Sequence, residues 1–267
     1  MTAAAKHFVG ALALACIITS CALRPSATAD HFRIILAGDS TMASVTGYGD
    51  ALCQRFDAAV TCINLARGGR STKSFRAEGL WEALLARLRE SDAAPTFVLI
   101  QFGHNDQPGK PGRSTSLPEF TENMRRYVDD VRAAGATPVL VTPLTRRSFK
   151  DSRLIDGLAP WAQATIEVAH QSKTILLDLH ADSIRAVAAL GPEHALDLAE
   201  LPPPESAQAA AKTGTTVEAP RPPPSATGGH VPAFDYTHLG HRGATLFSEI
   251  VATEIRASVP PLAPHIR

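Results

Sequence analysis

Five short apolar runs recur along the chain, and each ends in a polar stretch that contains glycine, proline or aspartate. Runs rich in isoleucine, leucine and valine, without regular polar alternation, are typical of strands that are buried on both faces of a sheet. The predicted strands are 32–37, 60–65, 96–101, 138–143 and 174–178.

Segments with apolar residues at helical spacing lie between these runs. The clearest spans 117–134, where Phe120, Met124, Tyr127 and Val131 recur every three or four residues and Gly135 follows as a stop signal. Strands that alternate with helices predict a parallel sheet joined by right-handed crossovers. We therefore expect a three-layer, doubly wound α/β domain with about five parallel strands and helices on both faces. The other predicted helices are 48–56, 80–88, 158–170, 182–190 and 244–255.

The composition changes abruptly between about 198 and 232, where proline, alanine, glycine and small polar residues dominate. Such a segment offers little apolar surface to offset the entropy of ordering it. We predict a disordered insertion within one domain that covers 30–267, with the fold resuming at Phe234.

The charge balance bears on the partners. The chain of 267 residues has 26 Lys and Arg residues against 26 Asp and Glu residues, and 45% of it is hydrophobic. A protein that follows nucleic-acid phosphates needs a basic excess or a basic face, so we expect no nucleic-acid partner.

The first 29 residues resemble an export signal, with Lys6 in a short polar start, an apolar run from 8 to 19, and small residues after it. Two routes fit. The Ala-Thr-Ala sequence at 27–29 fits a soluble cleavage site, and 18–21 resembles a bacterial lipobox whose Cys21 would carry lipid. We expect an exported protein, periplasmic or secreted, with membrane contact only through such an anchor.

Cys53 and Cys62 are the only cysteines beyond this leader. In an oxidising compartment an isolated pair is a candidate disulfide, and two buried thiols are the alternative. Two cysteines without a matching pair of Cys or His nearby do not form a tetrahedral set, so we expect no metal.

Four polar loops, at 38–40, 67–69, 103–106 and 235–238, concentrate residues that can do chemistry. The first three each follow a predicted strand. Because the carboxyl ends of parallel strands share one edge, where ligands bind in open α/β sheets, these loops should converge there.

Ser40 is a candidate nucleophile and His238 a candidate base. Asp235 lies three residues before His238, a spacing that lets its carboxylate reach Nδ1 of the imidazole and leaves Nε2 to face Ser40. Taken singly, these residues are more typical of turns and helix caps than of a catalytic site. His241 is the alternative base.

Acyl transfer also requires donors for an oxyanion. The N–H of Ser40, the N–H of Gly69 and the side-chain amide of Asn105 can supply them, although glycine and asparagine are also ordinary turn formers. His104 and Asp106 are assigned to the scaffold. We expect no cofactor.

Together these blocks resemble the SGNH hydrolases, the GDSL-type esterase superfamily. The resemblance covers the body of the chain and implies a flavodoxin-like sheet, a Ser-His-Asp triad and no metal. The four residues are Ser40 in Gly-Asp-Ser-Thr, Gly69 in Ala-Arg-Gly-Gly-Arg-Ser, Asn105 in Gly-His-Asn-Asp, and His238 in Asp-Tyr-Thr-His.

Within that superfamily the stretches 66–72, 101–106 and 135–143 look most like the rhamnogalacturonan acetylesterase group. Tyr236 departs from it, since asparagine is common there. The likeness implies a serine esterase, expected to be a monomer, that removes acetyl groups from a pectic polysaccharide. A lipase or thioesterase of the same superfamily and a non-catalytic glycan-binding protein are the alternatives.

Three arginines, Arg70, Arg146 and Arg147, could bind the carboxylate of a uronate. Ordinary surface arginines with packed stems are the alternative.

Overall fold

Five parallel strands form one sheet in the computed structural model of the protein, which describes residues 1–2, 31–89, 94–219 and 231–267. The strand order β2-β1-β3-β4-β7 is that of a doubly wound, flavodoxin-like sheet. This confirms the predicted fold. The strands are β1 (Phe32–Gly38), β2 (Val60–Asn64), β3 (Thr96–Gln101), β4 (Thr137–Val141) and β7 (Ile175–Leu177).

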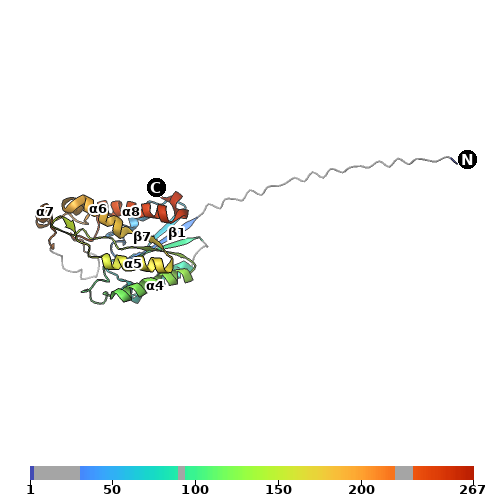
Figure 1. Cartoon of the computed structure of the whole chain (residues 1–267), viewed down its shortest axis with the longest axis horizontal. Coiled ribbons are helices and arrows are strands. Elements are labelled where there is room, and N and C mark those ends of the chain that lie inside the picture. The colour runs from blue at the N-terminus through green and yellow to red at the C-terminus, as the bar shows by residue number, and fades with distance from the viewer. Residues whose placement is uncertain (3–30, 90–93, 220–230) are drawn as a thin grey trace.

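Helices cover both faces of the sheet (Figure 1). The helices α6 and α8 lie on one side, and α4 and α5 lie on the other. Sequence periodicity did not predict α2, α7, the short hairpin β5–β6 or the two 3-10 turns. The bounds are α1 (Gly49–Cys53), α2 (Thr72–Ala77), α3 (Leu80–Arg89), α4 (Leu117–Ala133), β5 (Phe149–Lys150), β6 (Arg153–Leu154), α5 (Ala159–Ser172), α6 (Leu179–His194), η1 (Ala195–Leu198), α7 (Glu205–Lys212), α8 (His241–Ser258) and η2 (Pro260–His265).

Strand β1 shows how one apolar run serves two cores. Successive side chains of a strand point to opposite faces. Ile34 and Leu36 accordingly join the cluster that contains residues of α1, α6 and α8, whereas Ile35 and Ala37 join the cluster that contains residues of α2 to α5. All four side chains are fully buried, which is why β1 has no polar position in its interior apart from Arg33.

The ends of β1 and β3 are adjacent, and this places two of the predicted loops together. Gly38 at the end of β1 pairs with Gln101 at the end of β3. A Cβ at Gly38 would lie 2.7 Å from the carbonyl oxygen of Gln101, so this position requires glycine. The chain therefore leaves both strands at the same edge, as predicted.

The segment 198–232 is partly ordered, which corrects the prediction of a disordered insertion. Its first part contains α7, whose Ala207 and Ala211 are buried against Leu196 and Phe234. Alanine is the best helix former, and a face of small residues suffices to pack on two large ones. Residues 220–230 lie outside the described residues.

Cys53 and Cys62 are joined by a disulfide, with their Cα atoms 5.3 Å apart. The leader lies outside the described residues, apart from residues 1–2. Within the described part of the chain, none of the helices combines the length and the apolar character needed to cross a membrane.

Candidate active site

The turn after β1 holds Ser40 in a preorganised position. Oδ1 of Asp39 accepts hydrogen bonds from the backbone N–H of Thr41 at 2.9 Å and from its hydroxyl at 2.8 Å. The hydroxyl of Thr46 donates to the carbonyl oxygen of Ser40 at 2.8 Å. Ser40 itself is 7% exposed. The turn is thus fixed on both sides of the serine.

The predicted pair of Asp235 and His238 is in contact. Nδ1 of His238 lies 2.6 Å from Oδ2 of Asp235, and Oδ1 accepts from the N–H groups of His238 at 2.7 Å and Thr237 at 2.8 Å. Burial alone would raise the pKa of Asp235, but the bond and charge of His238 and the two N–H donors outweigh it and hold that pKa well below its usual range. Asp235 is therefore a carboxylate at any ordinary pH, as an orienting group must be.

Thr46 connects this pair to the serine turn. Its hydroxyl donates to the carbonyl oxygen of Ser40, and its own carbonyl oxygen accepts from the N–H of Leu239 at 2.9 Å. Leu239 directly follows His238. The loop after β1 and the turn before α8 are therefore joined through one residue, which brings the histidine to the serine side of the sheet edge.

Arg147 has a structural position, and its predicted role in substrate binding is wrong. The side chain is 1% exposed, and its guanidinium donates to the carbonyl oxygens of Asp235 at 2.9 Å, Thr237 at 3.2 Å and His238 at 2.8 Å. Burial lowers its pKa to about 10, which still leaves it protonated at neutral pH. Arg147 therefore holds the turn that carries the catalytic candidates and cannot face a ligand.

The loop with Gly68 and Gly69 lies beside the serine. A Cβ at Gly68 would be 3.8 Å from Cβ of Ser40, and Gly69 has a φ of +78°, in the left-handed region that glycine tolerates. The contact at Gly68 is an ordinary one and places the loop next to the serine, whereas a side chain at Gly69 would strain the backbone, so the position of Gly69 suits the predicted oxyanion donor.

Asn105 is held at the same place by bonds on both ends of its amide. Its Nδ2 donates to the carbonyl oxygen of Arg70 at 3.1 Å, and Nη1 of Arg113 approaches its Oδ1 at 3.4 Å and the carbonyl oxygen of Gly69 at 3.2 Å. Arg113 thus fixes which end of the amide carries the hydrogens. The NH₂ group has a second hydrogen beyond the bond to Arg70, and that hydrogen can serve an oxyanion.

Asp106 is part of the scaffold, as expected. Its Oδ1 accepts from the N–H of Thr72 at 3.1 Å and from the hydroxyls of Thr72 at 2.5 Å and Thr115 at 3.1 Å. Burial raises its pKa to about 6. The carboxyl group fixes the start of α2 to the loop that carries Asn105.

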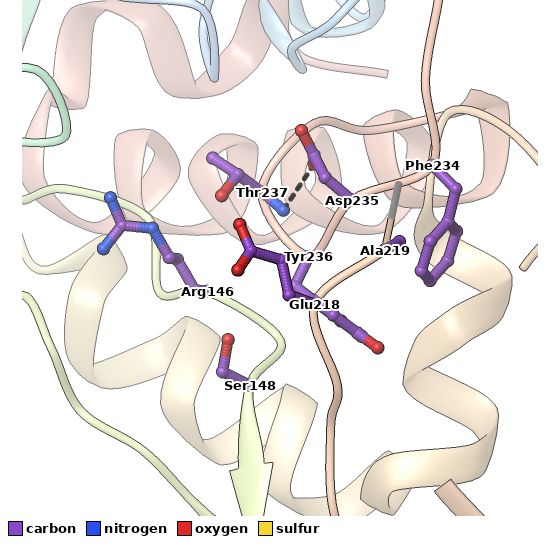
Figure 2. A pocket seen from close by; sticks show the side chains of 8 residues that line it. All are labelled: Arg146, Ser148, Glu218, Ala219, Phe234, Asp235, Tyr236 and Thr237. Atoms are coloured by element: carbon purple, nitrogen blue, oxygen red, sulfur yellow. Dashed lines mark hydrogen bonds between the residues drawn. The ribbon is translucent and has the colours of Figure 1, made fainter. Parts of the chain in front are cut away.

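The two remaining candidate arginines differ. The guanidinium of Arg70 is paired with Glu78 at 2.7 Å and donates to the carbonyl oxygen of Gly68 at 2.7 Å, so it holds the glycine loop. Arg146 lines a hollow of about 150 Å³ beside Asp235 (Figure 2). Its position, half-buried at the edge of the site, is compatible with ligand binding.

His241, the alternative base, is exposed at the first position of α8. It lines a separate hollow with Val45 and Arg55, whereas Asp235 contacts His238. The carboxylate that a catalytic histidine needs is therefore at His238. Among the described residues there is also no cluster of three His, Cys, Asp or Glu side chains that could hold a metal ion.

The sequence matches the GDSL-like lipase/acylhydrolase family over residues 35–203. The chain belongs to this family. The resemblance predicted from the four sequence blocks is confirmed, and this GDSL-like protein is a carboxylic ester hydrolase. The matched region ends before the turn that carries Asp235 and His238.

Two relatives resemble this GDSL-like hydrolase in sequence, and one solved structure shares its fold. It is 31% identical over 242 residues to rhamnogalacturonan acetylesterase RhgT of Bacillus subtilis (strain 168), across 88% of this chain and 94% of RhgT. It is 46% identical over 90 residues to the rhamnogalacturonan acetylesterase of Emericella nidulans, across 33% of this chain and 34% of that protein. The crystal structure of YxiM from Bacillus subtilis shares the fold, with a TM-score of 0.60 and 24% identity across 85% of this chain and 56% of YxiM.

Proposed function

We propose that the protein is an exported serine esterase that removes acetyl groups from a pectic, rhamnogalacturonan-like polysaccharide through an acetyl-enzyme. The observation that carries the reaction type is the 2.6 Å contact between His238 and Asp235, on a turn that Thr46 ties to Ser40. The likeness to RhgT over nearly its whole length supports the substrate class.

The first half of the proposed reaction forms the acetyl-enzyme. Nε2 of His238 removes the hydroxyl proton of Ser40 as Oγ attacks the acetyl carbonyl carbon, and Asp235 stabilises the imidazolium that results. The negative charge that develops on the carbonyl oxygen is bound by the N–H groups of Ser40 and Gly69 and by Nδ2 of Asn105. As the intermediate collapses, the imidazolium gives its proton to the leaving sugar oxygen.

The second half releases acetate. A water molecule gives a proton to Nε2 of His238 and attacks the acetyl-enzyme carbonyl, and the same donors bind the second oxyanion. Collapse breaks the bond to Oγ of Ser40, which recovers its proton from His238. The residues described so far supply every proton transfer without a cofactor.

The leader carries the proposal of export. We propose that residues 1–29 direct the chain out of the cytoplasm and that the mature protein acts as a monomer, either free after cleavage near Ala29 or anchored through lipid on Cys21. Cell fractionation of the parent and of Cys21→Ala tests this. A lipid anchor requires that the parent, but not the variant, stays with membranes.

Acetate release from a panel of glycans tests the reaction and the substrate. The panel contains acetylated rhamnogalacturonan, acetylated homogalacturonan and acetylated xylan, with Ser40→Ala as the control. We expect release from rhamnogalacturonan at the highest kcat/KM and none above background with Ser40→Ala.

Two further measurements separate the alternatives. A lipase or thioesterase would prefer nitrophenyl esters of longer acyl chains over the acetate ester. A non-catalytic glycan-binding protein would not react at Ser40 with a fluorophosphonate probe. Either result would overturn the proposal.

A further inference from the structure

The hollow beside Asp235 is built by three separate parts of the chain. Arg146 and Ser148 come from the stretch after β4, and Asp235 and Thr237 belong to the catalytic turn. The third part is the segment 213–219, which supplies Glu218. Figure 2 shows the eight side chains that line it, which are those of Arg146, Ser148, Glu218, Ala219, Phe234, Asp235, Tyr236 and Thr237.

The wall formed by 213–219 is anchored at several points. The N–H of Thr216 donates to the carbonyl oxygen of Phe149 at 3.0 Å, and the N–H of Ser152 donates to that of Gly214 at 2.9 Å. The hydroxyl of Tyr236 donates to the carbonyl oxygen of Val217 at 2.9 Å. The hollow is therefore held by ordered backbone contacts to the β5–β6 hairpin and to the catalytic turn.

The size and the lining of the hollow fit a sugar ring. A cavity of about 150 Å³ is large enough for a six-membered ring. The guanidinium of Arg146 offers donors, the carboxylate of Glu218 offers acceptors, and the hydroxyl of Ser148 offers both. The ring of Tyr236 adds an apolar surface for the C–H face of a sugar.

The charges in the lining favour a neutral ring over a uronate. Arg146 is the one cation among the eight lining residues, and Glu218 and Asp235 are two anions. The carboxylate of Asp235 is occupied by His238 and by the N–H groups of Thr237 and His238. A uronate carboxylate in the hollow would be attracted by Arg146 and repelled by Glu218, whereas neutral hydroxyls can donate to Glu218 and accept from Arg146.

The hollow also lies next to the reacting centre. It shares Asp235 and Thr237 with the turn that carries His238. Arg146 is close enough to the loop of Asn105 for its charge to reach His104, where it adds to the effect of burial in lowering the pKa of the imidazole. A ring bound in the hollow would therefore sit beside, and not at, the ester carbonyl.

We propose that this hollow is a subsite for one neutral sugar ring of the glycan, and that this ring is the neighbour of the acetylated sugar bound at Ser40. The segment 213–219 forms one wall of this subsite. This inference rests on the proposed function, since it assumes a glycan ester as substrate.

The test fills the hollow and compares two substrates. Ala219→Phe places a large side chain in the lining, and Ala209→Phe makes the same change on the exposed face of α7. For each protein, kcat/KM is measured with an acetylated rhamnogalacturonan oligosaccharide, in which neutral sugars alternate with uronates, and with 4-nitrophenyl acetate. We expect Ala219→Phe to lower the ratio of the two values at least tenfold and Ala209→Phe to leave the ratio within twofold.

Glu218→Gln probes the charge argument with a smaller change. It removes one anion from the lining and keeps an acceptor. The ligand is a short homogalacturonan oligosaccharide, which contains only uronates, and its Kd is measured in the inactive Ser40→Ala background. We expect this Kd to be about threefold to tenfold lower for Ser40→Ala/Glu218→Gln than for Ser40→Ala. The matched surface change Glu122→Gln, on α4, should leave that Kd unchanged.

The outcomes separate the inference from the proposed function. If the parent releases no acetate from any glycan, the proposed function fails, and calorimetry of Ser40→Ala with deacetylated rhamnogalacturonan oligosaccharide still tests the subsite. If the Ser40→Ala/Ala219→Phe protein no longer binds this oligosaccharide, the subsite is supported, whereas equal binding by the two proteins overturns it. If the parent is active and folded Ala219→Phe keeps the parental ratio, only the subsite is overturned. If Ala219→Phe does not fold, an unchanged uronate affinity in the Glu218→Gln protein overturns the assignment of a neutral ring.

Discussion

Oδ2 of Asp39 lies 3.4 Å from Nδ1 of His104, and the pair joins the turn that carries Ser40 to the loop that carries Asn105. Both side chains are buried, at 0% and 2% exposure. Burial opposes the ionisation of Asp39, but the neighbouring imidazole and the two bonds from Thr41 outweigh it and hold its pKa below the ordinary value. One carboxylate thus organises the nucleophile turn with one oxygen and faces the oxyanion loop with the other.

Removal of His104 should therefore reduce catalysis without reducing substrate affinity. His104→Ala leaves Oδ2 of Asp39 buried without a neighbour and frees the loop of Asn105. Because a misplacement of about 1 Å can cost about a hundredfold in rate, we expect kcat for 4-nitrophenyl acetate to fall by about that factor, with KM within threefold. His104→Asn, which can direct an amide N–H toward Asp39, should recover part of the loss. The control is His265→Ala, which removes a 3.1 Å contact with Asp57 outside the site. A fall in thermal stability with normal kcat would show that the contact between Asp39 and His104 has only a structural role.

The triad should behave as one unit. Ser40→Ala and His238→Ala should each lower kcat by at least about ten-thousandfold, and the double variant should be no worse than either, because nucleophile and base act in the same step. Asp235→Asn should lower kcat by a smaller factor. Steady-state kinetics on 4-nitrophenyl acetate measures all of them, with His241→Ala as the matched control. If His241→Ala is inactive and His238→Ala is active, His241 is the catalytic base.

Arg113 should matter through Asn105. Asn105→Ala should lower kcat by about a hundredfold to a thousandfold with little change in KM, since its bond to the oxyanion forms in the transition state. Arg113→Gln keeps the amide of Asn105 but removes the guanidinium that contacts its Oδ1 and the carbonyl oxygen of Gly69. We therefore expect kcat to fall about tenfold. If Arg113 acts by positioning Asn105, its substitution should add little to Asn105→Ala. Additive losses in the double variant would show that Arg113 acts by another route.

Glu254 gives the protein a pH-dependent stability. Burial, followed by the nearness of Asp182 and Asp178, raises its pKa from the ordinary 4.5 to about 9. Between these values the folded state keeps a proton that the unfolded state releases, so this contribution to stability is full below about pH 4.5 and is lost as the pH rises to about 9.

Glu254→Gln should therefore stabilise the protein at alkaline pH. We expect the free energy of unfolding in urea to rise by roughly 1 to 3 kcal/mol at pH 8, after allowance for solvent screening, and to change little at pH 4. Glu249→Gln, on the same helix, removes an exposed partner of Arg55 and Arg256 and should not stabilise. An equal effect of Glu254→Gln at both pH values would contradict the raised pKa.

The fold, and the sheet edge at which the candidate loops meet, could be predicted from the sequence for a physical reason. A parallel strand buried on both faces requires a continuous apolar run, so β1 and β3 are visible, and the residues that follow them must meet at one edge. The roles of Arg113, Arg147 and Thr46 could not be predicted, because each makes a backbone hydrogen bond to a partner far away in the chain, and no local pattern marks such a bond. These partners are Gly69 for Arg113, the turn 235–238 for Arg147 and Leu239 for Thr46. The prediction that Arg147 binds a ligand is wrong for this reason, since the sequence around two adjacent arginines does not show which of them is buried and which is exposed.

Helix α7 should be necessary for the site, although the composition of its segment predicts disorder. The reason lies in its buried face, where Ala207 and Ala211 pack on Phe234, the residue before Asp235. Ala211→Asp introduces a buried carboxylate, whose desolvation cost is large enough to favour undocking of the helix. Ala209→Asp makes the same change on the exposed face and serves as its matched control. We expect Ala211→Asp to lower Tm by about 5 °C and to lower kcat/KM for acetylated oligosaccharide at least tenfold, with new protease cleavage near α7. Ala209→Asp should leave all three unchanged. Equal and negligible effects of the two substitutions would show that the segment is dispensable, since only a docked helix distinguishes its two faces.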